Sequence, residues 1–224
     1  MIPFVRDFDF AHGRRDQVSP LIQRVIAHNP GPFTFTGTGT YIVGRAEPGA
    51  QVAVIDPGPL DEPHLAALLT AVAGRVVSHV LVTHTHRDHA PLARPFAEAV
   101  GAPIFAATPP VRTVHASATP DEDDDDSFAP DIVLSGGERL EGDGWTLGAL
   151  ATPGHASNHM SFVLENENAL FSGDHIMGWS TTVVAPPDGD MTAYMASLDA
   201  VIARRFSTIW PTHGGPILKP GPFL

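Results

Sequence analysis

Residues 76–89 read VVSHVLVTHTHRDH, and they indicate both the type of fold and its chemistry. Residues 76–82 form an apolar, β-branched run that is typical of a buried strand. Three histidines and one aspartate follow it at once, namely His84, His86, Asp88 and His89. Residues two apart at the exit of a strand point to the same side, and the turn brings the next ligands to an adjacent point. The spacing favours a metal site over a polar loop with incidental histidines.

Three later stretches each end an apolar run with a ligand-type residue beside small residues, which permit close approach of backbone and ion. They read TPGH at 152–155, SGDH at 172–175 and PTHG at 211–214. All four motifs together supply seven candidate ligands: His84, His86, Asp88, His89, His155, Asp174 and His213. These nitrogen and oxygen donors suit two Zn²⁺ ions and tolerate manganese or iron. We therefore predict a dinuclear metal site.

Composition limits the classes of protein. The chain has 224 residues, and 43% of them are hydrophobic, which suits one sizeable domain with a real core and excludes disordered, collagen-like and coiled-coil proteins. Because there is no cysteine, a disulfide framework, a thiolate metal site and a cysteine nucleophile are excluded. The net charge of −12 works against a broad nucleic-acid surface.

Location and partners are predicted from what the chain contains. Charged residues at positions 6, 7 and 9 interrupt the apolar stretch that a signal peptide needs, and no apolar run approaches 18 residues. We expect a soluble, cytoplasmic protein with no membrane association, and a homodimer stays open. The acidic run DEDDDD at 121–126 is expected to be a solvated loop.

Short strands and helical patterns interleave. Strands are predicted at 41–43, 52–55, 76–82, 103–106, 160–164, 169–172 and 208–210, and helices at 63–73, 91–100 and 192–203. Asp61 is a candidate cap for the first helix. In the last helix an apolar stripe is expected to lie in the core; it consists of Met191, Tyr194, Met195, Leu198, Val201 and Ile202. The pattern favours a layered mixed α/β fold.

The four ligand motifs, in this order, resemble those of the metallo-β-lactamase superfamily, whose HxHxDH motif corresponds to residues 84–89. The resemblance covers nearly the whole chain. It implies a four-layer αββα sandwich with the site at the sheet edges. It also implies that His84, His86 and His155 hold one ion, that Asp88, His89 and His213 hold the second, and that Asp174 bridges them.

The same motifs narrow the branch. True β-lactamases of this fold lack the bridging Asp174, and flavodiiron proteins have Glu where this chain has His86. The stretches at 29–34, 37–44, 55–58 and 152–160 resemble the β-lactamase-like endoribonuclease group, and the glyoxalase II and lactonase branches share Asp174.

Two features depart from the endoribonuclease group. Gly39 stands where that group usually has Asn, and the chain stops at Leu224, whereas those relatives continue into a C-terminal helical, winged-helix-like region. We therefore expect one domain over residues 1–224 without that region; a fragment of a longer chain is the alternative.

Several residues near the motifs are candidates for supporting roles. Asp56 could fix a histidine tautomer behind the metal loop, or simply form the turn before Pro57. His159 could contact substrate or donate a proton to a leaving group. His175 is expected to pack rather than to bind metal, and Trp179 is the one aromatic residue considered as a stacking platform. The remaining histidines, predicted to be structural or on the surface, are His12, His28, His64, His79 and His115.

These features predict a dinuclear zinc hydrolase in which a metal-bridging hydroxide attacks the substrate and Asp88 orients it or accepts its proton. Single-stranded RNA ranks slightly ahead of a small ester, thioester or lactone as substrate. A basic groove would favour RNA, and its candidates are Arg87, Arg94, Arg112, Arg204 and Arg205. An iron-dependent dioxygenase of the persulfide type and a non-catalytic metal-binding module are the alternatives.

Overall fold

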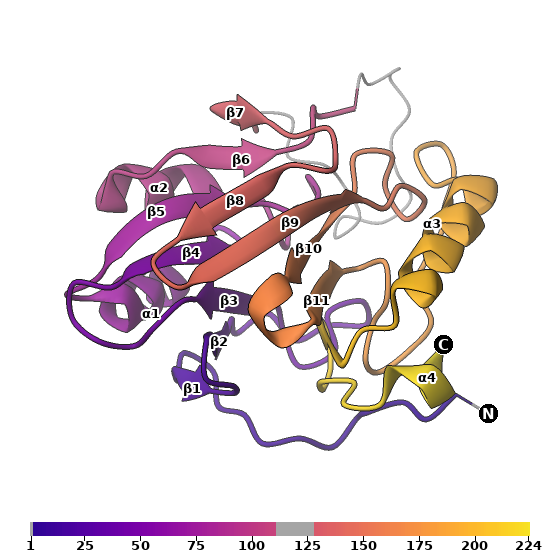
Figure 1. Cartoon of the computed structure of the whole chain (residues 1–224), viewed down its shortest axis with the longest axis horizontal. Helices are drawn as coiled ribbons and strands as arrows, with labels where there is room; N and C mark the ends of the chain where they lie inside the picture. The colour runs from indigo at the N-terminus through magenta and orange to yellow at the C-terminus, as the bar shows by residue number, and fades with distance from the viewer. Residues whose placement is uncertain (1, 111–127) are drawn as a thin grey trace.

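Two β-sheets lie face to face and helices cover both outer faces, in the four-layer αββα order that the family resemblance implies (Figure 1). The protein is described from a computed structural model, which covers residues 2–110 and 128–224. The predicted acidic loop at 121–126, and with it Arg112 and His115, lies outside the described residues.

The first sheet has seven strands in chain order: β1 (Asp16–Gln17), β2 (Ile22–Ile26), β3 (Gly39–Val43), β4 (Gln51–Ile55), β5 (Val76–Leu81), β6 (Ile104–Ala106) and β7 (Ile132–Val133). The pairs from β1 to β4 are antiparallel, and those from β4 to β7 are parallel. Because parallel strands end at the same edge of a sheet, Asp56 after β4 and the histidine motif after β5 meet there.

The second sheet has five strands in the order β12 (Thr208–Pro211), β11 (Ala169–Gly173), β10 (Met160–Leu164), β9 (Trp145–Ala151) and β8 (Arg139–Gly142). Strands β11 and β12 are parallel, whereas the other pairs are antiparallel. Asp174 directly follows β11 and His213 follows β12, so this sheet presents its ligands at the edge that faces the histidine motif.

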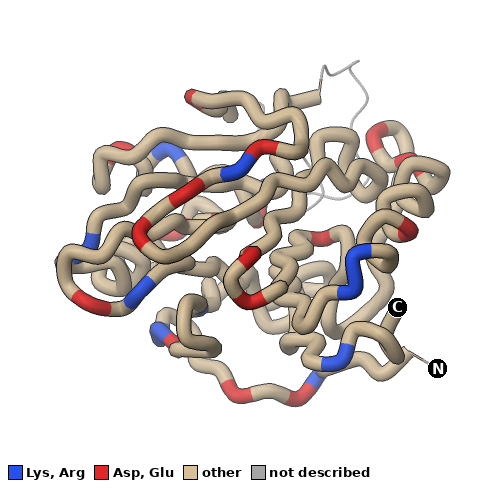
Figure 2. Tube along the Cα trace, in the orientation of Figure 1, with Lys and Arg blue, Asp and Glu red and all other residues tan. Residues whose placement is uncertain are grey.

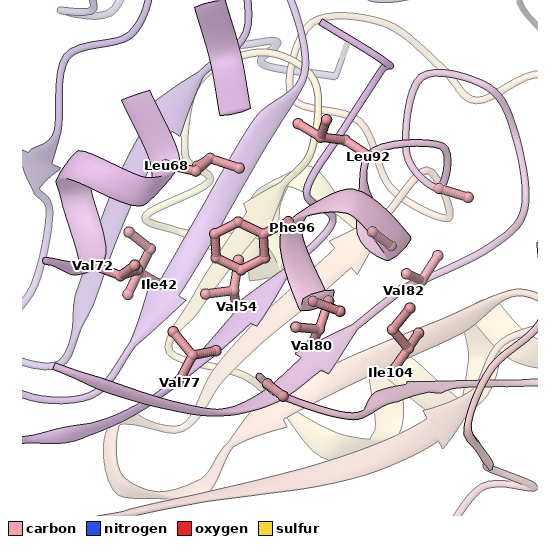
Figure 3. Packing of buried hydrophobic residues seen from close by; sticks show 14 of the residues in the cluster. Ile42, Val54, Leu68, Val72, Val77, Val80, Val82, Leu92, Phe96 and Ile104 are labelled. Atoms are coloured by element: carbon pink, nitrogen blue, oxygen red, sulfur yellow. The ribbon is translucent and has the colours of Figure 1, made fainter. Parts of the chain in front are cut away.

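Helices α1 (Glu62–Val72) and α2 (Ala93–Val100) cover the outer face of the first sheet (Figure 1). The expected Asp61 cap is confirmed, since its side chain accepts a hydrogen bond from the backbone N–H of His64 at 3.0 Å. Figure 3 shows Leu68 of α1 and Phe96 of α2 above Val54 of the sheet. All three side chains are fully buried, and this packing fixes the helices against the sheet.

The two inner faces share a second core of bulky side chains, which includes Tyr41, Leu81, Trp145, Phe162 and Phe171. The outer face of the second sheet is covered by α3 (Met191–Arg204) and α4 (Pro220–Phe223). Val201 and Phe223 of these helices pack with Ile209 of β12. A 3₁₀ turn (Glu165–Glu167) joins β10 to β11.

The expectation that the whole apolar stripe of α3 lies in the core is wrong. Met191, Met195 and Ile202 are 57%, 49% and 41% exposed, and among the stripe residues only Val201 is buried. The helix turns the narrower face of Tyr194, Ser197 and Val201 toward the sheet. A stripe of six apolar residues is wider than that contact, so Met191, Met195 and Ile202 face solvent, while Leu198 packs against the edge of the core.

Strands β1, β2, β7, β8 and β9 are absent from the predicted set. In β2 all five residues are buried, including Gln23 and Arg24, whose polar side chains conceal the strand in the sequence. No helix in the described part of the chain has both the length and the apolar character required to cross a bilayer. Lys and Arg are scattered along the described trace without a continuous basic stripe (Figure 2).

Candidate metal centre

The first group of ligand atoms comes from three buried histidines. Nε2 of His84 lies 2.9 Å from Nδ1 of His86, and Nε2 of His155 lies 3.1 Å from the same atom. Three nitrogens bound to one tetrahedral zinc at about 2.0–2.1 Å would stand about 3.3 Å apart. The spacing is therefore close to that of three nitrogen ligands of one ion.

Hydrogen bonds behind two of these rings fix a tautomer that suits metal binding. Thr83 Oγ1 donates to Asp56 Oδ2 at 2.8 Å, so it accepts from Nδ1–H of His84 at 3.0 Å. His155 Nδ1–H donates to the backbone oxygen of Val183 at 2.6 Å. The rings of His84 and His155 then each present an unprotonated Nε2, which is the tautomer that a metal ligand requires.

The second group consists of Asp88, His89, Asp174 and His213, all buried. Asp88 Oδ2 lies 3.0 Å from Nε2 of His213 and 3.4 Å from Nε2 of His89. The His213 ring is oriented by its Nδ1–H, which donates to the backbone oxygen of Gly37 at 3.3 Å. Two imidazoles and two carboxylates so placed form a second N/O site.

Asp174 lies between the two groups. Its Oδ1 is 3.5 Å from Nε2 of His89 and 3.4 Å from Nε2 of His213, and its Oδ2 is 3.8 Å from Nε2 of His155. One carboxylate oxygen thus faces each group, as a bridging ligand does.

Buried atoms without hydrogen-bond partners test whether a cation fits. Nε2 of His89, Nε2 of His213 and Oδ1 of Asp174 are all of this kind. Such atoms are costly when left unpaired. The Asp174 oxygen lies 3.5 Å from the His89 nitrogen and 3.4 Å from the His213 nitrogen. The donor set therefore fits a divalent cation.

Asp56 supports the second group from behind. Its Oδ2 accepts from Nδ1–H of His89 at 2.9 Å, and its Oδ1 accepts from the backbone N–H of Thr83 at 2.8 Å. The residue is fully buried and adopts a left-handed backbone with φ of 49°. Both interpretations of Asp56 therefore apply: it forms the turn before Pro57, and it fixes the tautomer of His89. The left-handed backbone of that turn directs the carboxylate toward the His89 ring.

His159 and His175 lie beside the ligands without belonging to either group. Nε2 of His159 accepts from the backbone N–H of Asp174 at 3.1 Å, and its Nδ1 is 2.8 Å from Thr152 Oγ1. His175 is fully buried and packs against the ring of Tyr194, with centroids 4.8 Å apart. The sequence did not indicate that His159 contacts the backbone of Asp174, because that hydrogen bond joins two separate segments.

Among the predicted structural histidines and basic-groove residues that the structure describes, most lie away from the two ligand groups. His79 packs in the inter-sheet core against Phe105, and the rings of exposed His12 and His28 lie 4.4 Å apart at the surface. Arg94 forms an ion pair with Asp131 at 3.0 Å. Arg87, Arg204 and Arg205 are exposed, and of these only Arg87 adjoins the ligands.

Electrostatics differ between the two groups. Burial lowers the pKa of His84 well below its usual value, and burial also lowers the pKa of His86 to about 3. Burial opposes charge on His89 as well, but the carboxylates of Asp88, Asp174 and Asp56 outweigh it and raise the pKa of His89 well above its usual value. His84 and His86 are therefore neutral, whereas the second group holds ionised carboxylates beside protonatable imidazoles.

The chain matches the metallo-beta-lactamase superfamily over residues 35–213, a range that includes all seven ligand candidates. It belongs to this superfamily. One curated relative is an atrochrysone carboxyl ACP thioesterase of Claviceps purpurea. This chain is 33% identical to it over 204 residues, which cover 90% of this chain and 59% of the relative. It is 32% identical over 211 residues to a beta-lactamase-like protein 2 homolog of Caenorhabditis elegans, covering 91% and 65%. The chain thus spans less than two thirds of both relatives.

Solved structures agree on the fold of this superfamily member. A metallo-beta-lactamase family protein from Thermus thermophilus superposes with a TM-score of 0.64 at 24% identity, covering 91% of this chain and 76% of that one. TTHA1623, solved in a di-iron-bound form, superposes with a TM-score of 0.63 at 25% identity, covering 86% and 92%. At least one protein of similar fold was thus solved with two iron ions bound.

Proposed function

We propose that this protein is a dinuclear metal-dependent hydrolase that cleaves thioesters. The observation that carries the proposal is the pair of adjacent buried ligand groups, with one oxygen of Asp174 facing each. Two divalent ions held there supply an activated water near neutral pH and polarise the oxygen of the bond under attack. Thioester cleavage is supported by the thioesterase names among the relatives that are 33–34% identical to this chain over the aligned residues.

The side chains have separate tasks in this proposal. His84, His86 and His155 hold the first ion, and His89, His213 and Asp88 hold the second. Small exposures remain at four ligands, namely Asp88 (8%), Asp174 (7%), His86 (8%) and His155 (8%), whereas His89 and His213 have none, so substrate approaches from the side of these four ligands. Asp88 is placed there to orient the attacking water or to accept its proton. The absence of cysteine leaves no route through a cysteinyl acyl-enzyme.

The test is hydrolysis of acyl-N-acetylcysteamine thioesters by protein with measured zinc, manganese or iron content. Released thiol is read with a disulfide reagent, and a chain without cysteine gives no background signal. Activity is expected to vanish in Asp174→Ala and to persist in Asp143→Ala, a matched change of an exposed aspartate in the β8–β9 turn. Turnover equal in Asp174→Ala and wild type would refute the metal-dependent mechanism.

Single-stranded RNA is the second candidate substrate. It is favoured by the stretches at 29–34, 37–44 and 152–160, which resemble the β-lactamase-like endoribonucleases. The scattered basic residues weigh against it (Figure 2). Labelled single-stranded RNA in the same assay decides: cleavage that depends on Asp174, without thioester hydrolysis, would replace the thioesterase proposal. Activity with iron alone and consumption of oxygen would instead indicate the dioxygenase alternative.

A further inference from the structure

Of the three tryptophans, one lies outside the core. Trp145 and Trp210 are buried between the sheets, whereas Trp179 is partly exposed in the loop after Asp174. Its ring stacks on Phe35, which is also partly exposed, with centroids 5.0 Å apart and planes within 8°. The two residues are far apart in the sequence, so the pair is a product of the fold.

Both loops that carry the pair contact His213. The backbone oxygen of Gly37, two residues from Phe35, accepts from His213 Nδ1–H at 3.3 Å. The backbone N–H of Gly178, adjacent to Trp179, donates to the His213 backbone oxygen at 3.0 Å. Each of the two loops therefore lies against His213, one at the Nδ1 of its ring and the other at its backbone oxygen.

The chain holds this pair in place by specific contacts. Phe35 adopts a left-handed backbone with φ of 55°, which is uncommon for a bulky residue, and its N–H donates to the backbone oxygen of Gly31 at 2.9 Å. Arg6 Nε donates to the backbone oxygen of Trp179 at 3.0 Å. Gly214 also packs against the backbone of Trp179, since a Cβ at that glycine would lie 2.8 Å from the backbone nitrogen of Trp179. The stacked pair is therefore held by loops that contact a candidate metal ligand, and one of its members keeps an uncommon backbone conformation.

We propose that Phe35 and Trp179 form an apolar wall of the substrate site that holds the acyl group of a thioester and favours aromatic or branched apolar acyl groups. This inference rests on the proposed thioesterase function. A flat, partly exposed aromatic pair presents apolar surface, which gains free energy by covering an apolar group and offers nothing comparable to an acetyl group. Phe35 and Trp179 then determine specificity without taking part in bond cleavage.

The activity test compares the ratio of kcat/KM for a phenylacetyl thioester to that for an acetyl thioester. In Trp179→Ala and in Phe35→Leu this ratio is expected to fall at least about tenfold. Trp179→Phe, which keeps an aromatic ring, is expected to restore most of it. Phe33→Leu is the matched control, because Phe33 lies in the same loop as Phe35, whose ring is the one that stacks on Trp179. The ratio for Phe33→Leu should equal that for wild type. Metal content is measured for every variant. An unchanged ratio in the first two variants, with metal retained, overturns the proposal.

A binding test separates this proposal from the proposed function. Phenylacetate added to the metal-loaded protein is expected to change tryptophan fluorescence, and Trp179→Phe is expected to abolish the change because the other two tryptophans are buried. If wild type hydrolyses no thioester but this signal appears, the wall stands and the thioesterase proposal fails. If single-stranded oligonucleotide alters the signal and phenylacetate does not, Trp179 is a base-stacking platform and the acyl proposal is overturned.

Discussion

The carboxylate of Asp56 lies 2.9 Å from Nδ1 of His89 and turns the opposite nitrogen of that ring toward Asp88 and Asp174. The same carboxylate accepts from Thr83, whose hydroxyl orients His84. One buried aspartate at the end of β4 thus orients a histidine in each ligand group. It touches no candidate substrate position, so its effect on activity acts through the metal ligands.

Replacing Asp56 with Asn is expected to weaken metal binding. The amide can donate a hydrogen bond where the carboxylate only accepts, so the His89 tautomer is no longer fixed. Loss of such a partner costs about 10- to 100-fold in metal affinity. Chelator competition measures this, with Asp143→Asn as the exposed control. Equal affinities in Asp56→Asn and the control would show that the contact does not tune the site.

Metal binding is expected to release protons. Without metal, the carboxylates of Asp88, Asp174 and Asp56 outweigh burial and raise the pKa of His89, and the pKa of His213 is raised in the same sense by Asp174 and Asp88. These imidazoles therefore hold a second proton more readily than a free histidine does, and an ion must displace it, so affinity should rise with pH. Titration calorimetry in buffers of different ionisation enthalpy counts the protons. A heat independent of the buffer would contradict the prediction.

His159 is expected to position Asp174 rather than to donate a proton. Its Nε2 already accepts from the N–H of Asp174, and its Nδ1 pairs with Thr152. The side chain is 1% exposed, and burial holds the pKa of the ring well below its usual value. His159→Gln should keep both limbs of the pH profile of kcat/KM, whereas His159→Leu should lower metal content, because the Asp174 N–H loses its acceptor. If one limb of the pH profile disappears in His159→Gln, His159 donates a proton to the leaving group and the positioning role is wrong.

His64 is expected to make the fold sensitive to acid. Its Nε2 lies 2.9 Å from Thr40 Oγ1, which donates to the backbone oxygen of Asp56, and burial lowers the pKa of His64 to about 4. A depressed folded pKa means that the unfolded chain binds the proton first. Stability is therefore lost as pH falls from about 6.5 toward 4, by roughly 1–2 kcal/mol at pH 5.

Denaturant unfolding of the metal-loaded protein at pH 7 and pH 5 measures this loss. In His64→Gln the difference between the two pH values should shrink by that amount. His28→Gln removes an exposed histidine that adjoins neither His64 nor the ligands, and it should change the difference little. An undiminished difference in His64→Gln would exclude His64 as a source of acid sensitivity.

Phe96 is expected to contribute strongly to stability. Its ring is fully buried between α2 and the first sheet, beside Leu68 and Val54 (Figure 3). Phe96→Ala should lower the free energy of unfolding by about 3–5 kcal/mol, because a cavity remains where the ring packed. Leu60→Ala, at a position that is 73% exposed, should change it by less than about 0.5 kcal/mol. Urea unfolding compares the two, and similar losses would contradict the packing described.

The ligand types, their order and the αββα architecture follow from the amino-acid sequence and from the family that its motifs resemble. Residues 84–89 come directly after an apolar strand, and the later motifs each end another apolar run. The candidate metal ligands can therefore be predicted from local spacing in the sequence. The partners that stand behind the ligands are set by tertiary contacts instead. The contacts of Asp56 with His89, of His159 with Asp174 and of Phe35 with Trp179 join segments that are distant in the chain.

The exposed positions of α3 and the buried Gln23 and Arg24 of β2 depend in the same way on what each element packs against. Periodicity reports which faces of a helix or strand are apolar. How much of a face is covered is set by neighbouring elements, because burial is a property of contacts between segments that the linear order of residues does not contain.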